Sequence, residues 1–281
     1  YLWMSKRSRF YPKKIKSTGW RIGTELVSPN LNEFRFSFDY TSAYNNFEEP
    51  REEDVFIKEP AIYEVEFNYK SDTREKIQYS FGIEHSYAVD EYLSEQKNSI
   101  ELNLGLGFRL SDRFNLDYEI KKEKSIDDIG YVFNEGEDIY FGKRNVKVLE
   151  NNLNLNYNFN SYKSLVLKFR QFWSSANYND SFFLLNSKGE RILSDKSVKD
   201  NDPNKSFNLW NLDLSYNWEF LPGSKLTLLY RNNIFNEDNL SGISYYSSTK
   251  ELFEKPIDHQ VSLRINYFLD YNILKRKKSR I

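Results

Sequence analysis

The sequence predicts an all-β fold, a transmembrane up-and-down antiparallel β-barrel, on three observations. Apolar and polar residues alternate along most of the chain, aromatic residues make up 17% of it, and short and long connections follow one another in turn. Because successive side chains of a strand point to opposite faces, each alternating run has one apolar and one polar face. About 11 or 12 strands are recognisable, and we expect them to form the C-terminal part of a larger even-stranded barrel.

The composition sets further bounds. The 281 residues include 40 Lys and Arg against 41 Asp and Glu, a balance that offers no global field for nucleic acid. There is no Cys, which excludes disulfides and thiolate metal sites. No window holds the roughly 18 to 20 apolar residues of a transmembrane helix. The chain starts at Tyr1 inside strand-like sequence without a signal peptide, so we expect upstream strands and an N-terminal domain to be missing from it.

The apolar positions of the alternating runs are expected to face lipid, and the polar positions between them to line a water-filled or polar-packed interior. The predicted lipid-facing residues are Phe34, Phe36, Phe38, Tyr63, Val65, Phe67, Ile77, Tyr79, Phe81, Leu102, Leu104, Leu106, Leu116, Leu153, Leu155, Leu212, Leu214, Val261, Leu263 and Ile265. A soluble β-sandwich is the alternative. Its strands usually run about 5 to 6 residues, whereas these run about 9 to 14, the length that a tilted strand needs to cross a bilayer.

Connections of two lengths give the expected topology. Short ones fall at 28–33, 71–75, 111–113, 160–164 and 221–225, and long ones at about 45–60, 89–98, 124–145, 178–206 and 237–258. Short periplasmic turns and long extracellular loops are typical of bacterial outer-membrane barrels. We expect a barrel over residues 1–273 and a basic periplasmic tail over 274–281, which either contacts anionic lipid or a partner or is a disordered end.

Aromatic residues recur near the strand ends predicted to be periplasmic. Rings with a polar tip settle at the lipid headgroups, so these residues predict an aromatic girdle. Its expected members are Tyr69, Phe108, Phe114, Phe159, Trp218, Phe220 and Tyr271.

Four stretches of the sequence resemble motifs of one protein family. They are Tyr140–Asn145, Leu167–Ser174, Tyr216–Ser224 followed by Leu226, and His259–Arg264 with Tyr267–Tyr271. Together they resemble the C-terminal barrel of a Bacteroidota outer-membrane family of undetermined function, over roughly residues 100–275. Full-length members carry a family-9-type carbohydrate-binding domain ahead of the barrel. The resemblance implies a scaffold, and it assigns sugar binding to no residue of this chain.

The sequence offers few candidates for catalysis. The two histidines, His85 and His259, are expected near the extracellular rim, solvated or packed among aromatic rings. Ser86 faces away from His85 on a strand, which excludes that pair. Asp258 lies at the end of a loop, so a pair between Asp258 and His259 remains open. We therefore expect no enzymatic activity, with an outer-membrane hydrolase as the least favoured alternative.

Acidic loops and one apolar hairpin complete the candidates. Carboxylates cluster at Glu48, Glu49, Glu52, Glu53, Asp54 and Glu59, at Asp127, Asp128, Glu135, Glu137 and Asp138, and at Asp200 and Asp202. Such oxygens can bind Ca²⁺, but none of the spacings matches an EF-hand, so solvated loops and no cofactor are expected. Residues 182–193 predict a hairpin whose apolar start, Phe182–Leu185, docks on a partner or folds back on the barrel.

The leading function is an integral outer-membrane, porin-like scaffold or pore that displays or accompanies a carbohydrate-binding domain. A structural subunit of a larger outer-membrane complex is the alternative. Expected partners are outer-membrane lipid and lipopolysaccharide, with glycans or other outer-membrane proteins as further candidates and no nucleic acid. The long loops are expected outside the cell and the C-terminus in the periplasm of a Gram-negative bacterium.

Overall fold

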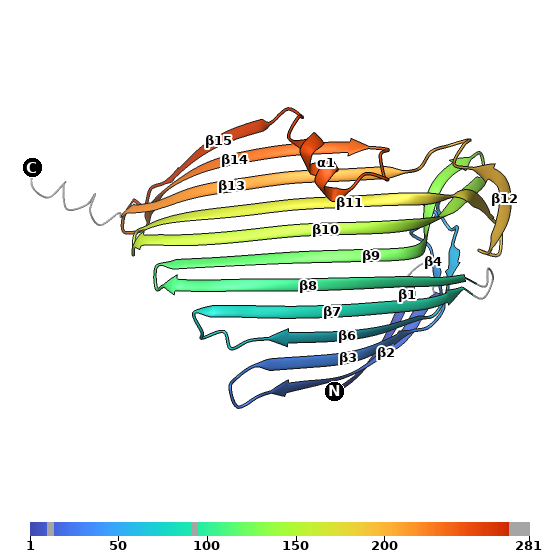
Figure 1. The fold of residues 1–281 in the computed structure, drawn as a ribbon, viewed down its shortest axis with the longest axis horizontal. Helices are drawn as coiled ribbons and strands as arrows, with labels where there is room; N and C mark the ends of the chain where they lie inside the picture. The colour runs from blue at the N-terminus through green and yellow to red at the C-terminus, as the bar shows by residue number, and fades with distance from the viewer. Residues whose placement is uncertain (10–13, 91–94, 270–281) are drawn as a thin grey trace, which may run out of the picture.

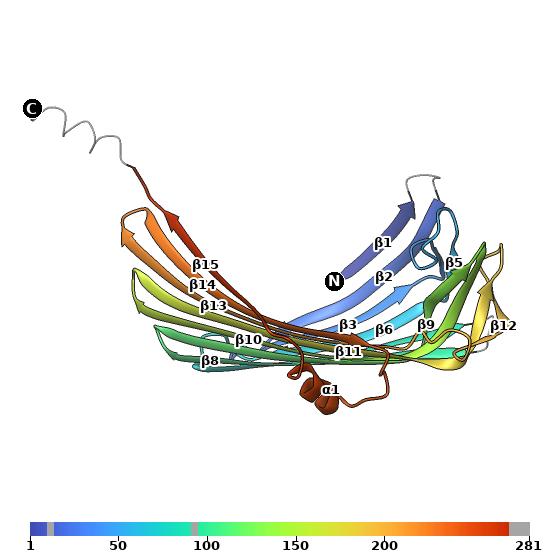
Figure 2. The same cartoon turned by 90° about the horizontal axis from the view of Figure 1, so that it is seen from above.

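The computed structural model describes residues 1–9, 14–90 and 95–269, and its main body is one antiparallel sheet of 13 strands (Figure 1). Each strand pairs with the next in sequence along the path β1-β2-β3-β6-β7-β8-β9-β10-β11-β13-β14-β15, and β12 pairs with β11 beside this path. Seen from above, the sheet is curved into a trough, with β1 and β15 at its two edges (Figure 2). The predicted all-β, up-and-down antiparallel architecture is confirmed.

The strands of the N-terminal half are β1 (Leu2–Arg9), β2 (Lys14–Val27), β3 (Glu33–Thr41), β4 (Tyr44–Asn46), β5 (Ile57–Glu59), β6 (Ile62–Lys70), β7 (Ile77–Asp90) and β8 (Glu95–Ser111). Those of the C-terminal half are β9 (Phe114–Glu135), β10 (Asp138–Asn160), β11 (Lys163–Leu185), β12 (Arg191–Ser197), β13 (Lys205–Leu221), β14 (Ser224–Asp238) and β15 (Asp258–Asn266), with one helix, α1 (Tyr245–Leu252). All the strands expected from alternation are present, and the leading segment forms β1. Strand β12 belongs to the hairpin expected over residues 182–193, and the two short strands β4 and β5 and the helix are additions.

The short connections gather at one end of the sheet, here called the short-turn end. They join β2 to β3, β6 to β7, β8 to β9, β10 to β11 and β13 to β14, as the sequence predicts. The last of these turns runs through Pro222 and Gly223, and Gly223 has φ +76°, a left-handed conformation that glycine adopts without strain.

The opposite, long-loop end differs from the expectation over residues 124–145. These residues are not a loop, because β9 and β10 run on for 22 and 23 residues and turn tightly at Gly136 and Glu137. A strand pairs through its backbone, and ladder hydrogen bonds form whatever the side chains are. A bilayer needs only about 9 to 11 residues of tilted strand, so β9, β10 and β11 project well beyond that length.

Three segments of the long-loop end pack around a small apolar core. Ile57 and Phe141 are fully buried, and Ile139 joins them. The β11–β12 hairpin docks on β5, where the Lys58 amide donates to the Gly189 carbonyl at 2.8 Å. The predicted hairpin over 182–193 is confirmed, and Phe182 and Phe183 are buried. Its apolar start therefore folds back on the molecule.

Helix α1 interrupts the connection between β14 and β15. Its N-terminus is capped by Ser244, whose hydroxyl accepts from the Ser247 amide. The helix lies on the convex side of the trough (Figure 2). No helix in the described part of the chain is long and apolar enough to cross a membrane.

The two outer strands of the sheet are its open edges. Within the described ranges, β1 pairs only with β2 and β15 pairs only with β14. Edge strands with unpaired backbone groups invite further strands. The described residues end at residue 269. The last predicted barrel residues, 270–273 with Tyr271, and the predicted basic tail, 274–281, lie outside them.

Candidate functional site

The convex face of the sheet carries the apolar residues. Helix α1 lies on this face, and its Tyr245 contacts Gln171 and Trp173 on β11. By alternation, Leu167 and Phe169 on the same strand point to the same face as Gln171 and Trp173. The register extends the face across the sheet, with Leu104 opposite both Phe81 and Ile120. The 20 residues predicted to face lipid all fall on it in the strand register.

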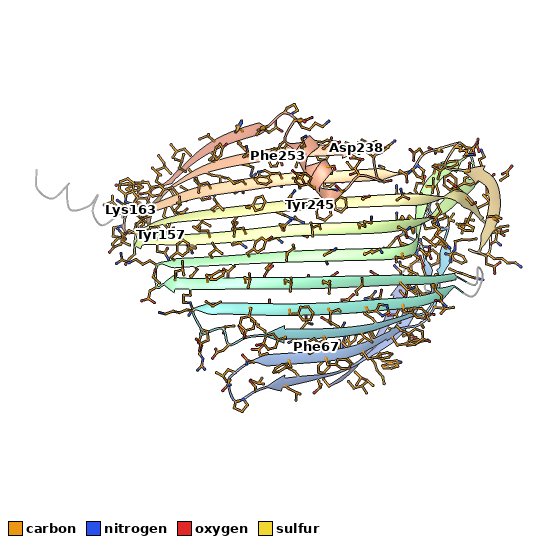
Figure 3. All side chains as sticks on the ribbon, viewed as in Figure 1. Phe67, Tyr157, Lys163, Asp238, Tyr245 and Phe253 are labelled. Carbon is orange, nitrogen blue, oxygen red and sulfur yellow. The ribbon has the colours of Figure 1, made fainter. Side chains whose placement is uncertain are left out.

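Many of these apolar side chains are exposed to solvent. Leu104 is 51% exposed, Tyr79 51% and Phe36 48%. Contiguous apolar surface of this extent is rare on proteins in water and marks a contact with another apolar phase or a partner. Figure 3 shows side chains of this face, including the labelled Phe67 and Tyr157, spread over the strands rather than gathered into a core.

Aromatic rings cluster toward the short-turn end of the same face. Tyr69 lies 5.1 Å from Phe34 between ring centroids, Trp218 lies 5.9 Å from Phe220, and Phe159 lies 4.8 Å from Tyr157. Six of the residues expected in a girdle belong to the described part, and neighbouring Tyr157, Tyr79 and Tyr216 extend the row without having been predicted. Cross-strand ring pairs stabilise a sheet in any solvent, so the ring contacts by themselves do not define a membrane boundary.

The concave face is polar, and many of its charges are paired across strands. Arg231 donates to both oxygens of Asp213 at 2.7 and 2.8 Å, and these residues are direct register partners. Lys121 reaches Glu101 at 2.6 Å, and Arg170 reaches Glu150 at 2.9 Å. Pairing of this kind lowers the cost of holding many charges on one confined wall.

The concave face is hollowed over β9 to β15 by a groove of about 810 Å³. Amides and charged groups dominate its lining, which includes Glu119, Asn152, Asn154, Lys168, Arg170, Asn211, Asp213, Arg231, Asn233, Asp258 and Gln260. Amide side chains both donate and accept hydrogen bonds, so this wall can form hydrogen bonds with water or with a polar solute. Smaller hollows of about 340 and 220 Å³ lie over β2 to β9 on the same sheet.

By register both histidines belong to the convex face, and His259, on edge strand β15, also lines the groove. His85 is exposed opposite Val65 and Ile100. His259 contacts the Tyr230 hydroxyl through Nδ1 at 2.8 Å, with the two rings stacked. Alternation along β15 turns Asp258 to the concave face, away from His259. The structure thus separates the Asp258 and His259 side chains that the sequence left as a possible pair.

The acidic loop residues serve as contacts between segments. In the first group, Glu48 pairs with Lys16 at 2.6 Å, Asp54 with Arg9 at 2.9 Å, and Glu49 accepts from the Tyr131 amide at 3.0 Å. Glu52 accepts from Asn134 at 2.8 Å. In the third group, Asp200 accepts from the Ser197 amide, and Asp202 from the Asn204 amide. Over the described residues no group of three or more side chains is arranged to hold a metal ion.

The second acidic group contains a buried ion-pair centre. Asp128 lies between Lys97 and Arg144, and Arg144 also donates to the Tyr178 hydroxyl at 2.9 Å. Burial alone would raise the pKa of the Asp128 carboxyl, but Lys97 and Arg144 hold that pKa below its ordinary value. Nearby on β5, burial raises the pKa of the Glu59 carboxyl. Together these contacts join β5, β8, β9, β10 and β11 at the long-loop end.

Sequence reasoning missed the polar patch beneath α1. Asn151, Gln171 and Asn208 lie on the otherwise apolar convex face, and α1 binds all three through Tyr245, Thr249 and Ser248. The Ser175 hydroxyl also donates to the Ser241 carbonyl at 2.5 Å. The sequence does carry a sign of this patch, because polar residues occupy positions of neighbouring strands that are otherwise apolar. Such side chains need hydrogen-bond partners from another segment when the face around them is apolar.

The curved antiparallel sheet, with one apolar and one polar face, has the fold of part of a β-barrel wall. It is similar to the copper transporter OprC, with a TM-score of 0.55 and 9% identity over 96% of this chain and 42% of that chain. It is also similar to the ferric citrate transporter FecA in its unliganded form, with a TM-score of 0.51 and 11% identity over 94% of this chain and 40% of that one. At these identities the likeness shows the fold alone.

The chain belongs to the family described as Domain of unknown function (DUF5916), whose model matches residues 1–278. A family of undetermined function is what the sequence motifs suggested. No curated protein is similar to the chain in sequence. The chain spans about two-fifths of the length of the two transporters that it resembles.

Proposed function

We propose that this chain is part of the wall of a transmembrane β-barrel in the outer membrane of a Gram-negative bacterium, acting as a non-enzymatic scaffold or pore. The separation of the two faces carries this proposal. The convex face is apolar and exposed, whereas the concave face is polar, ion-paired and grooved. Lipid outside and water inside is the arrangement in which both faces are satisfied.

The dimensions of the apolar face support a membrane-spanning role. On β9 the convex face is apolar or aromatic from Phe114 to Ile120 and turns basic at Lys122. Counted from Phe114 to the border at Lys122, this stretch is nine residues, about the length of strand that crosses a bilayer at a tilt. In this orientation the aromatic residues of the short-turn end form the girdle at the periplasmic interface, and the long-loop end is extracellular.

The open edges at β1 and β15 call for further strands, because an unpaired edge in lipid leaves backbone groups unsatisfied. We propose that further strands of the same polypeptide close the barrel. The same edges also favour the second candidate, a structural subunit of a larger outer-membrane complex in which another chain supplies the strands.

The display of a family-9-type carbohydrate-binding domain and an origin in Bacteroidota belong to this proposal through the motif resemblance. Glycans would then be partners of that domain. Lipopolysaccharide and other outer-membrane lipids would contact the convex face. The concave groove over β9 to β15 would pass or hold polar solutes.

Three measurements test the proposal on the full-length protein. The protein is expected in the outer-membrane fraction after washing with alkaline carbonate, and release into the supernatant would contradict a membrane barrel. Conductance in planar bilayers then separates the two roles, since discrete current steps indicate a pore and an intact, inserted but silent protein indicates a closed scaffold. Co-purification of a second chain that remains bound through the wash would support the complex.

A further inference from the structure

Three lysines gather on the convex face at the border of the apolar surface. Lys122 and Lys124 alternate on β9 and share that face with Tyr118 and Ile120. Lys147 on β10 is the direct register partner of Lys124. All three are exposed. Directly opposed residues have Cβ atoms about 5 Å apart, so the three ammonium groups share one small area.

Like charges placed directly opposite each other destabilise a sheet unless something neutralises them. The described residues provide no carboxylate that pairs with Lys122, Lys124 or Lys147, although other lysines of the sheet are paired. The nearest acidic residues on β8 and β9, Glu101 and Glu123, point to the concave face by alternation. The cluster is therefore an uncompensated positive patch.

The surroundings of the patch decide what kind of anion fits it. The cross-strand neighbours of Lys122 are Leu102 and Leu149, and Ile100 is opposite Lys124. On the other side Lys147 is opposite Ser175, which the segment leading to α1 covers. None of the three hollows described above is lined by these lysines, and the apolar side chains below the lysines continue to the short-turn end. An anion that is itself attached to an apolar chain matches this border of charge and apolar surface.

We propose that Lys122, Lys124 and Lys147 bind the headgroup phosphates of an anionic outer-leaflet lipid, the class to which lipopolysaccharide belongs. The inference rests on the proposed membrane role and names the site of lipid contact within it. Lysine binds phosphate as a mobile point charge, and three such charges suit a headgroup that carries more than one phosphate. The acyl chains of the same lipid then lie along Leu102, Ile120 and their neighbours.

The test uses the full chain in zwitterionic detergent micelles, titrated with bisphosphorylated lipid A. Binding is followed by the rise of the thermal unfolding midpoint and by lipid A retained per protein after gel filtration. The parent protein is expected to respond to lipid A, but not to dephosphorylated lipid A or to inorganic phosphate. Each lysine near an anionic surface contributes about fivefold, so K122Q/K124Q/K147Q is expected to bind roughly 100-fold more weakly.

The matched control removes three exposed lysines elsewhere, K188Q/K199Q/K225Q, and is expected to bind lipid A like the parent. Equal binding by the K122Q/K124Q/K147Q variant, equal loss in the control, or an equal response to inorganic phosphate would overturn the lipid site. Insertion into phosphatidylcholine vesicles is measured in parallel. A parent protein that inserts but ignores lipid A refutes this site alone, whereas a parent that fails to insert refutes the membrane role as well.

Discussion

The Tyr245 hydroxyl on α1 donates a hydrogen bond of 2.5 Å to Oε1 of Gln171 in the middle of β11. Gln171 is only 4% exposed, and its amide nitrogen donates to the Thr249 hydroxyl on the same helix. Both ends of an amide on the apolar convex face are thus satisfied by a connecting segment whose sequence separation from it is more than 70 residues. Helix α1 therefore covers a polar patch that lipid would not tolerate.

Replacing Tyr245 by Phe should destabilise the protein by about 1–3 kcal/mol, because the Gln171 carbonyl oxygen loses a buried partner. Adding Gln171→Leu should recover part of that loss, so the double-mutant cycle should show coupling between the two positions. The unfolding free energy in lipid vesicles is the measurement. Tyr246→Phe is the matched control, since Tyr246 is 79% exposed, and a loss in the control equal to that of Tyr245→Phe would argue against the contact.

A lysine at Leu104 should cost roughly 2–4 kcal/mol, because it places a charge on the lipid-facing side near the middle of the bilayer. A lysine at the adjacent Asn103 should be mild, since Asn103 faces the concave side and donates to the Glu101 carboxylate at 2.9 Å. Urea unfolding of both variants in vesicles compares them. Equal penalties at the two positions would refute the assignment of faces.

Tags inserted at Gly136 or at Lys188 should be reachable by antibody on intact cells, because both lie at hairpin tips of the long-loop end. Tags at Gly223, in a short turn, or after Arg280 should become reachable only when the outer membrane is permeabilised. Labelling at Gly223 in intact cells, with Gly136 protected, would invert the orientation.

The ion-pair centre at Asp128 should make the long-loop end sensitive to acid. The folded-state pKa of this carboxyl is lowered, so its stabilisation is complete above the ordinary aspartate pKa of about 3.9 and is lost as pH falls through the lower folded value. Asp128→Asn should abolish the sensitivity and loosen the β9–β10 hairpin at neutral pH, which protease cleavage near Glu137 would report. Glu59→Gln should change stability at neutral pH in the opposite direction to Asp128→Asn. The pKa of the Glu59 carboxyl is raised, so its ionisation costs stability as pH rises.

We expect no catalytic activity from the two histidines, which lie on the convex face without a serine or a carboxylate in the contacts described for them. The double variant His85→Gln/His259→Gln should therefore behave like the parent on lipid, peptide and glycan substrates. An activity present in the parent and lost in this variant would promote the hydrolase alternative.

The sequence by itself determined the order of the strands, the turns between them and the assignment of residues to two faces. These features are local, because the alternation at Leu102, Leu104 and Leu106 encodes a face through neighbours two residues apart. The motifs around Tyr216 and His259 also indicated a family without an established chemistry.

Only the tertiary structure decided how distant segments meet. The docking of Tyr245 on Gln171, the burial of Ile57 against Phe141, and the approach of Lys147 to Lys124 depend on strand register and on surfaces far apart in the chain. Residues 124–145 looked like a loop for the same reason. These residues form the ends of β9 and β10, which are held together by backbone hydrogen bonds that the local sequence pattern does not predict.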